Sequence, residues 1–93
     1  MSTDLSHPLL DRPLELHPQV ALRPEPFGAL AYHYGNRRLV FLKHADMVTV
    51  ARSLADHPSL AAALEASHID PRRWPSFAAA FSSLLQSEVV RER

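Results

Sequence analysis

The distribution of proline most constrains how this chain can fold. Five of the eight prolines lie within the first 26 residues, and none lies between Phe27 and His57. Proline fixes φ and cannot donate to a β-ladder, so it is confined to turns, edge strands and first helical turns. We therefore predict a flexible N-terminal arm over residues 1–13 and a single domain over residues 14–93, with at best an edge strand at residues 19–23.

A β-hairpin is predicted directly after the proline-rich segment. Residues 29–34 and 38–43 are rich in aromatic, aliphatic and β-branched side chains, and Gly35-Asn36 lies between them. Glycine in the first position of a two-residue loop is typical of a type II′ turn. The predicted sheet is thus an antiparallel meander of three strands.

The register implied by this turn divides the hairpin side chains between two faces. Because the larger apolar set should be the one that is buried, we expect the face that carries Leu30 and Tyr32 to pack on the core. That face pairs Tyr32 with Leu39 and Leu30 with Phe41. The opposite face pairs His33 with Arg38, Ala31 with Val40 and Ala29 with Leu42.

Helical periodicity fills the second half of the chain. Apolar residues recur at helical spacing within residues 44–55, 58–67 and 71–87. Three helices that follow a three-stranded antiparallel sheet make an α+β, winged-helix-like domain.

The helix ends are less well determined than the helices themselves. Pro58 suits the first position of the second helix. For the third helix two starts remain open: Asp70 caps a helix that begins at Pro71, or the regular helix begins at Pro75. Val89-Val90 is a candidate for a short terminal strand.

Composition argues against several classes of function. The chain has no cysteine, only two glycines, and six histidines of which no two are three to five residues apart. Thiol chemistry, phosphate-cradling loops and helical metal pairs are therefore not expected. We predict no enzymatic activity, no catalytic residue, no cofactor and no metal.

Charge and hydropathy bound the partners and the location. Ten basic residues balance ten acidic ones, which does not favour nucleic-acid binding. No apolar run is long enough to span a bilayer, and the first residues lack the pattern of a signal peptide. We expect a cytoplasmic protein that binds neither membranes nor nucleic acids.

Basic and aromatic residues suggest where a partner would bind. Arg37-Arg38 and Arg72-Arg73 are either solvated surface charge or the borders of one groove that attracts an acidic or extended partner. Trp74 is either a core anchor or a contact at the rim of such a groove. The apolar stripe of the third helix is mostly core, although part of it could floor the groove.

The third predicted strand, residues 38–43, is apolar on both faces and ends the meander. An exposed apolar edge is a site of aggregation unless something covers it. A helix, a second copy of the chain or an added peptide strand would each serve. If a peptide adds here through the amide of Val40, a proline at this position should abolish its binding.

Four segments carry a likeness to a known family. They are residues 16–30, Tyr32-His33-Tyr34-Gly35 followed by Arg37-Arg38-Leu39, Phe41-Leu42-Lys43, and residues 53–58. Together they resemble the mycofactocin precursor-peptide chaperones, over roughly residues 14–90, with residues 17–43 as the specific part. That family is similar to the pyrroloquinoline-quinone peptide chaperones, and both are precursor-peptide recognition elements.

The resemblance implies three strands followed by three helices, in agreement with the patterns above. It implies that the chain holds the leader of a ribosomally made precursor peptide and brings it to a radical S-adenosylmethionine maturase, which carries the clusters and the chemistry. In related elements the leader pairs with the third strand and lies against the third helix. Pro75 departs from the wider pattern, so the phase of that helix stays open. The candidate peptide-binding residues are Arg38, Leu39, Val40, Phe41, Leu42, Lys43, Arg73, Trp74, Phe77, Ala80, Phe81 and Leu84.

Two alternatives use the same fold. A winged-helix DNA-binding domain is compatible with the outline, but zero net charge and the lack of a basic helix face count against it. A small dimerisation module is compatible with the apolar strand edge, which could pair two copies into a homodimer.

Overall fold

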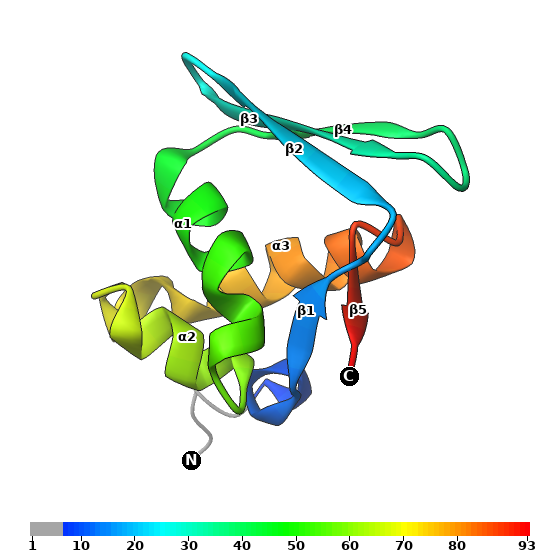
Figure 1. Ribbon diagram of the computed structural model, residues 1–93. Coiled ribbons are helices and arrows are strands. Elements are labelled where there is room, and N and C mark those ends of the chain that lie inside the picture. Colours follow the sequence, from blue (N-terminus) through cyan, green and yellow to red (C-terminus); the bar gives the residue numbers. More distant parts are fainter. Residues whose placement is uncertain (1–6) are drawn as a thin grey trace.

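The computed structural model describes residues 7–93 and has the predicted α+β architecture (Figure 1). A three-stranded antiparallel sheet has the order β2-β3-β4, so β2 and β4 are its edges. Three helices follow it along the chain. These elements are β2 (Val20–Glu25), β3 (Gly28–His33), β4 (Leu39–Leu42), α1 (Ala45–Ser53), α2 (Leu60–Ala66) and α3 (Trp74–Gln86).

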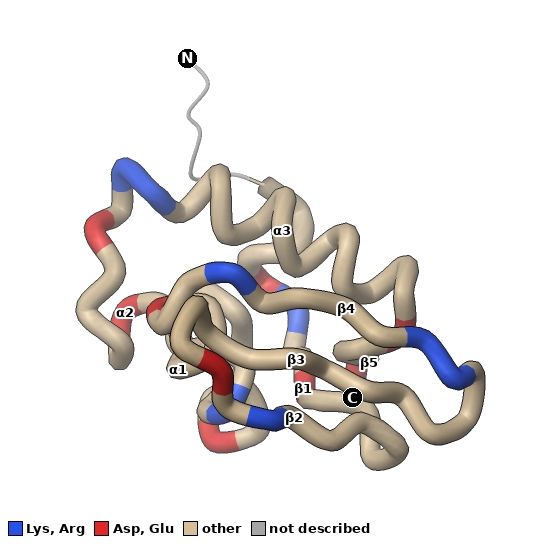
Figure 2. Tube along the Cα trace, turned by 90° about the horizontal axis from the view of Figure 1, so that it is seen from above, with Lys and Arg blue, Asp and Glu red and all other residues tan. Residues whose placement is uncertain are grey.

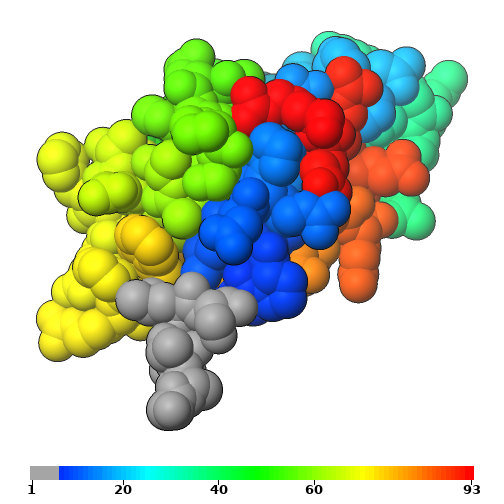
Figure 3. Space-filling model, turned by 90° about the horizontal axis from the view of Figure 1, so that it is seen from below, coloured from blue at the N-terminus to red at the C-terminus, as the bar shows by residue number. Residues whose placement is uncertain are grey.

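A second, two-stranded sheet joins the two ends of the described chain. β1 (Leu14–Leu16) pairs antiparallel with β5 (Val90–Glu92), so the predicted strand at Val89-Val90 exists and is displaced by one residue. Figure 3 shows these segments, blue and red, side by side on one face of the molecule. The sequence did not indicate β1, because three residues between two prolines carry too little pattern.

The first described residues contribute to the core. The 3₁₀ turn η2 (Pro8–Asp11) buries Leu10, which is 3% exposed. Residues 1–6 of the predicted N-terminal arm lie outside the described residues. The predicted boundary at residue 14 stays a prediction.

The β3–β4 turn differs from the predicted one, although the register is confirmed. Tyr32 lies opposite Leu39 and Leu30 opposite Phe41. Residues 34–38 connect the two strands, and the positive φ belongs to Arg37 (66°), not to Gly35, so the type II′ assignment was wrong. Both loops place the same residues opposite one another, which is why the register survives the change of turn.

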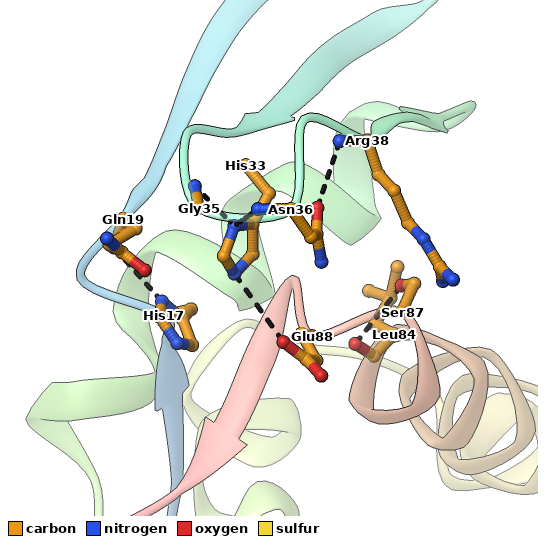
Figure 4. A network of polar contacts seen from close by, with 9 residues as sticks. All are labelled: His17, Gln19, His33, Gly35, Asn36, Arg38, Leu84, Ser87 and Glu88. Atoms are coloured by element: carbon orange, nitrogen blue, oxygen red, sulfur yellow. Dashed lines mark hydrogen bonds and ion pairs between the residues drawn. The ribbon is translucent and has the colours of Figure 1, made fainter.

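A buried histidine organises this turn (Figure 4). His33 Nδ1 accepts hydrogen bonds from the backbone N–H of Gly35 (3.0 Å) and of Asn36 (3.1 Å). The backbone N–H of Arg37 donates to the carbonyl oxygen of His33 at 2.8 Å. The turn is thus stabilised by hydrogen bonds to the His33 side chain, and it does not need the positive φ at Gly35 that a two-residue turn would require.

The prediction of which sheet face is buried was wrong. Figure 1 shows the three helices on one side of the sheet, and the face they cover carries Ala29 (0% exposed), Ala31 (1%) and Leu42 (2%). The large side chains of Leu39 and Phe41 are on the open face, 59% and 61% exposed. The small alanine side chains allow α1 to pack closely against β3. The buried face was therefore decided by how closely the helix can pack, and not by which face carries more apolar surface.

Local hydrogen bonds set the helix starts. The second helix begins at Leu60, not at Pro58, because Ser59 is its cap: the Ser59 Oγ accepts from the backbone N–H of Ala62 at 3.1 Å. Asp70 is the cap with Pro71 in the first position, as one alternative predicted, but the turn it begins is the 3₁₀ turn η4 (Pro71–Arg73). The regular helix α3 starts at Trp74, one residue before the start that the other alternative gave. The first helix ends in the 3₁₀ turn η3 (Leu54–Asp56).

Two features are absent from residues 7–93. No helix in this part of the chain has both the length and the hydropathy to cross a bilayer. Nor do three histidine or acidic side chains converge anywhere in it as metal ligands would.

Candidate functional site

A groove runs between β4 and α3. Figure 2 shows β4 as the sheet strand that lies alongside α3. Two hollows of about 320 Å³ and about 200 Å³ adjoin here, since both are lined by His44, Met47 and Ala80. We call this surface the β4–α3 groove; its residues are Val40, Phe41, Leu42, Lys43, His44, Met47, Arg73, Ser76, Phe77, Ala80, Ser83 and Leu84.

The helical side of the groove is one stripe of α3. Its residues recur every three or four positions, which places them on a single face of the helix. Phe77 and Leu84, each 5% exposed, form the apolar floor, and the small side chain of Ala80 leaves the space between them. Ser76 and Ser83 are exposed at the rim. The groove is therefore apolar at depth and polar along its margin.

Eight of the twelve predicted peptide-binding residues line this groove: Val40, Phe41, Leu42, Lys43, Arg73, Phe77, Ala80 and Leu84. Phe81 is 0% exposed and lies in the core. The indole Nε1 of Trp74 donates to the carbonyl oxygen of Ile69 at 2.9 Å, so this ring supports the start of α3. Arg38 and Leu39 are exposed at the start of β4 and do not line either hollow.

Four lining residues escaped the sequence-based prediction. His44 and Met47 lie at the start of α1, just after β4. The prediction assigned the groove only to the third strand and the third helix, so it left these two residues out. Ser76 and Ser83 are small and polar, so no apolar pattern indicates them. Once the helix phase is known, their spacing from Arg73 and Ala80 places them on the same face.

The free edge of β4 exposes particular backbone groups. The backbone N–H of His33 donates to Arg38 at 3.0 Å, and the register pairs Ala31 with Val40. Hydrogen-bonded and non-hydrogen-bonded pairs alternate in an antiparallel ladder. The N–H groups of Val40 and Leu42 therefore face β3, whereas those of Leu39 and Phe41 point away from the sheet.

Each predicted arginine cluster contributes one residue near an end of the groove. Arg73 closes one end: its Nη1 is 3.0 Å from Asp46 Oδ2, and its guanidinium lies 5.1 Å from the centroid of the Phe77 ring. Figure 4 places Arg38 at the other end, above the last turn of α3. Among the described residues, neither Arg37 nor Arg38 has an acidic partner.

Arg72 lines neither hollow and has a local role. It is 88% exposed and its side chain binds the carboxylate of Asp70 at 2.8 Å. The hydrogen bonds from Arg72 lower the pKa of Asp70 to about 2. This pair fixes η4, the turn that leads into α3.

The buried His33 ring also lies close to Glu88, which comes just after the end of α3. The ring is 3% exposed and lies 4.4 Å from the ring of His17. Its Nε2 is 3.9 Å from Glu88 Oε1 and has no hydrogen-bond partner in the described structure. Because Nδ1 is an acceptor, the proton of the neutral ring belongs on Nε2, which points toward that carboxylate.

Comparison with known proteins decides the family. The Peptide chaperone MftB family matches residues 13–91. The chain belongs to this family. "Peptide chaperone MftB" of Mycobacterium ulcerans is 48% identical over 86% of this chain and 73% of the relative, and its counterpart in Mycobacterium tuberculosis is 43% identical over 89% and 76%. That of Mycolicibacterium smegmatis is 48% identical over 81% and 74%. The search of solved structures gave no significant match.

Membership of the MftB family confirms the resemblance seen in the sequence. It supports the role of a peptide chaperone. A peptide in an extended conformation needs an elongated binding surface, and the β4–α3 groove has that shape.

Proposed function

We propose that the chain binds the leader of the mycofactocin precursor, a ribosomally synthesised peptide, in the β4–α3 groove and delivers it to a radical S-adenosylmethionine maturase. The observation that carries the proposal is that, within residues 7–93, the outer edge of β4 pairs with no other strand and lies directly beside an apolar hollow. A peptide that adds to β4 as a fourth strand would pair its backbone and fill the hollow at the same time.

The backbone geometry supports strand addition. The amides of Leu39 and Phe41 point away from β3 and are available to a new strand. Val40, which the sequence suggested as the residue to replace by proline, points its amide toward β3. Proline at Val40 would break the existing sheet, so it cannot test binding separately from folding.

The side chains of the groove suggest the chemistry of the peptide. Alternate side chains of an added strand point to one face, so every second leader residue would contact the floor made by Met47, Phe77 and Leu84. Those positions favour aliphatic side chains. Arg37, Arg38 and Lys43 carry positive charge at the ends of β4. They favour acidic residues at leader positions that do not contact the apolar floor.

The division of labour with the maturase follows from composition. The chain has no cysteine with which to hold an iron–sulfur cluster, so the redox chemistry belongs to the enzyme. The chaperone holds the leader in one conformation, which lowers the entropy that the enzyme must remove when it engages the peptide. We place this exchange in the cytoplasm.

Calorimetric titration with a synthetic precursor leader tests the proposal. We expect saturable one-to-one binding with a negative heat-capacity change, because apolar surface is buried. Ala80→Glu places a carboxylate in the groove and should weaken binding at least about tenfold, since an unpaired charge is costly to bury.

Ala79→Glu is the matched control. Ala79 adjoins Ala80 on α3 and is exposed outside the groove, so the same charge there should leave the affinity within about twofold. Equal affinities of the Ala80→Glu and wild-type proteins would place the peptide elsewhere. No heat and no change in leader fluorescence on mixing would reject the proposed function.

A further inference from the structure

The open face of the three-stranded sheet is a second apolar surface. All four large hydrophobic side chains that are exposed within residues 7–93 belong to it: Phe27 (44%), Tyr34 (60%), Leu39 (59%) and Phe41 (61%). Within this surface the Phe27 ring meets the Phe41 ring edge-on at 5.6 Å, and the Tyr32 ring meets the Tyr34 ring edge-on at 5.0 Å. We call Phe27, Leu30, Tyr32, Tyr34, Leu39 and Phe41 the outer face.

Clustered exposure of this kind marks an interface. Single exposed hydrophobic residues are ordinary on protein surfaces, but contiguous aromatic patches are typical of protein-binding sites. The helices lie on the other side of the sheet (Figure 1), and the floor of the β4–α3 groove is made by side chains of α1 and α3, so a leader in that groove would leave most of the outer face open.

We propose that the outer face docks a folded protein that presents an apolar patch with an acidic rim. Resting on the proposed function, this protein is the enzyme that receives the peptide. Docking on one face of the sheet would then leave the groove on the other face occupied, so chaperone, peptide and enzyme could form one complex.

The first argument is continuity between the two surfaces. Phe41, Lys43 and His44 line the β4–α3 groove, and together with Phe27 they line a hollow of about 510 Å³ beside it. A protein seated on the outer face would therefore touch the strand that pairs with the leader. Such a protein meets the bound peptide without displacing it.

The second argument is charge. Arg37 and Arg38 lie at one end of β4 and Lys43 at the other (Figure 2), and none of the three has an acidic partner among the described residues. Glu25, at the far edge, is paired with Arg23 at 2.8 Å. A second copy of this chain would bring one basic rim against another, whereas an acidic rim would be complementary.

The test uses variants that spare the peptide groove. Phe27→Ser with Tyr34→Ser removes two exposed rings that do not line the groove, and circular dichroism verifies the fold. Affinity for the synthetic leader is measured by calorimetry, and affinity for the purified radical S-adenosylmethionine maturase by biolayer interferometry. Ala80→Glu is the reciprocal variant, altered in the groove alone.

We expect the double variant to bind the leader within about twofold of wild type but the maturase at least tenfold more weakly. Ala80→Glu should bind the leader at least tenfold more weakly, but in the absence of peptide it should bind the maturase within about twofold of wild type. Wild-type affinity of the double variant for the maturase would overturn the outer-face proposal while leaving peptide binding intact. A wild-type dimer that the double variant converts to a monomer, measured by sedimentation, would assign the face to a second copy and also overturn it. Failure of the wild-type protein to bind leader would instead refute the proposed function.

Discussion

Leu42 and Phe41 are neighbours on β4 that point to opposite faces of the sheet, so their truncation tests which face is buried. Leu42 is 2% exposed. Leu42→Ala should lower the free energy of unfolding by about 2–5 kcal/mol, the range for leucine truncation in a core. Phe41 is 61% exposed and its main neighbour is the Phe27 ring. Phe41→Ala should cost no more than about 1 kcal/mol.

Urea unfolding followed by circular dichroism measures both values. A loss of 2 kcal/mol corresponds to roughly 8 °C or more in Tm for a domain of this size, and it is a large part of a typical stability of about 5–15 kcal/mol. If the larger apolar face were buried, the two variants would exchange places. A Phe41→Ala protein less stable than the Leu42→Ala protein would therefore refute the assignment of the faces.

Three further predictions concern backbone, charge and capping. Gly28→Ala should destabilise by more than about 1–3 kcal/mol, because φ is +151° and the new Cβ would lie 2.1 Å from the Leu42 carbonyl oxygen. A Cβ on Gly35 would lie 2.5 Å from the flexible Gln19 side chain and 2.8 Å from Cε1 of the buried His33 ring, but it meets no backbone atom and its φ is ordinary, so Gly35→Ala should cost less; the opposite order of melting temperatures would be evidence against this backbone. Because the pKa of Asp70 is lowered to about 2, its stabilising effect is complete above the usual value of 3.8 and is lost as pH falls through 2. Unfolding of Asp70→Asn should consequently depend less on pH between 4 and 2, and an unchanged profile would contradict this. Trp74→Phe removes the hydrogen bond to Ile69 and should cost about 1–3 kcal/mol by urea unfolding; a neutral result would mean that the bond does not hold the start of α3.

The fold class was predictable because proline spacing and hydrophobic periodicity are local signals. The register of β3 and β4 followed from a turn centred on Gly35-Asn36, because the loop that forms is centred on the same two residues. The buried face did not, since it depends on how closely α1 approaches Ala29 and Ala31, which is a property of the packed whole. The β1–β5 sheet joins segments from opposite ends of the chain, and no local pattern reports such a contact.

The candidate site divides in the same way. The strand side was predictable, because an apolar strand that ends a meander must have a free edge. The helix side needed the phase of α3, which the caps at Asp70 and η4 determine. Phe81 and Ala80 are adjacent in sequence, yet one is core and the other lines the groove. The hydrophobic periodicity of the sequence placed both residues near the groove but could not show which of them is buried in the core.

Hydrogen exchange of the β4 amides, followed by NMR with and without a saturating synthetic leader, tests the central claim most directly. Val40 and Leu42 donate within the sheet and should be protected in both states. Leu39 and Phe41 should exchange quickly in the free protein and become protected when the leader is bound, because the added strand accepts their hydrogen bonds. Unchanged exchange at Leu39 and Phe41 in the presence of bound leader would contradict strand addition at this edge.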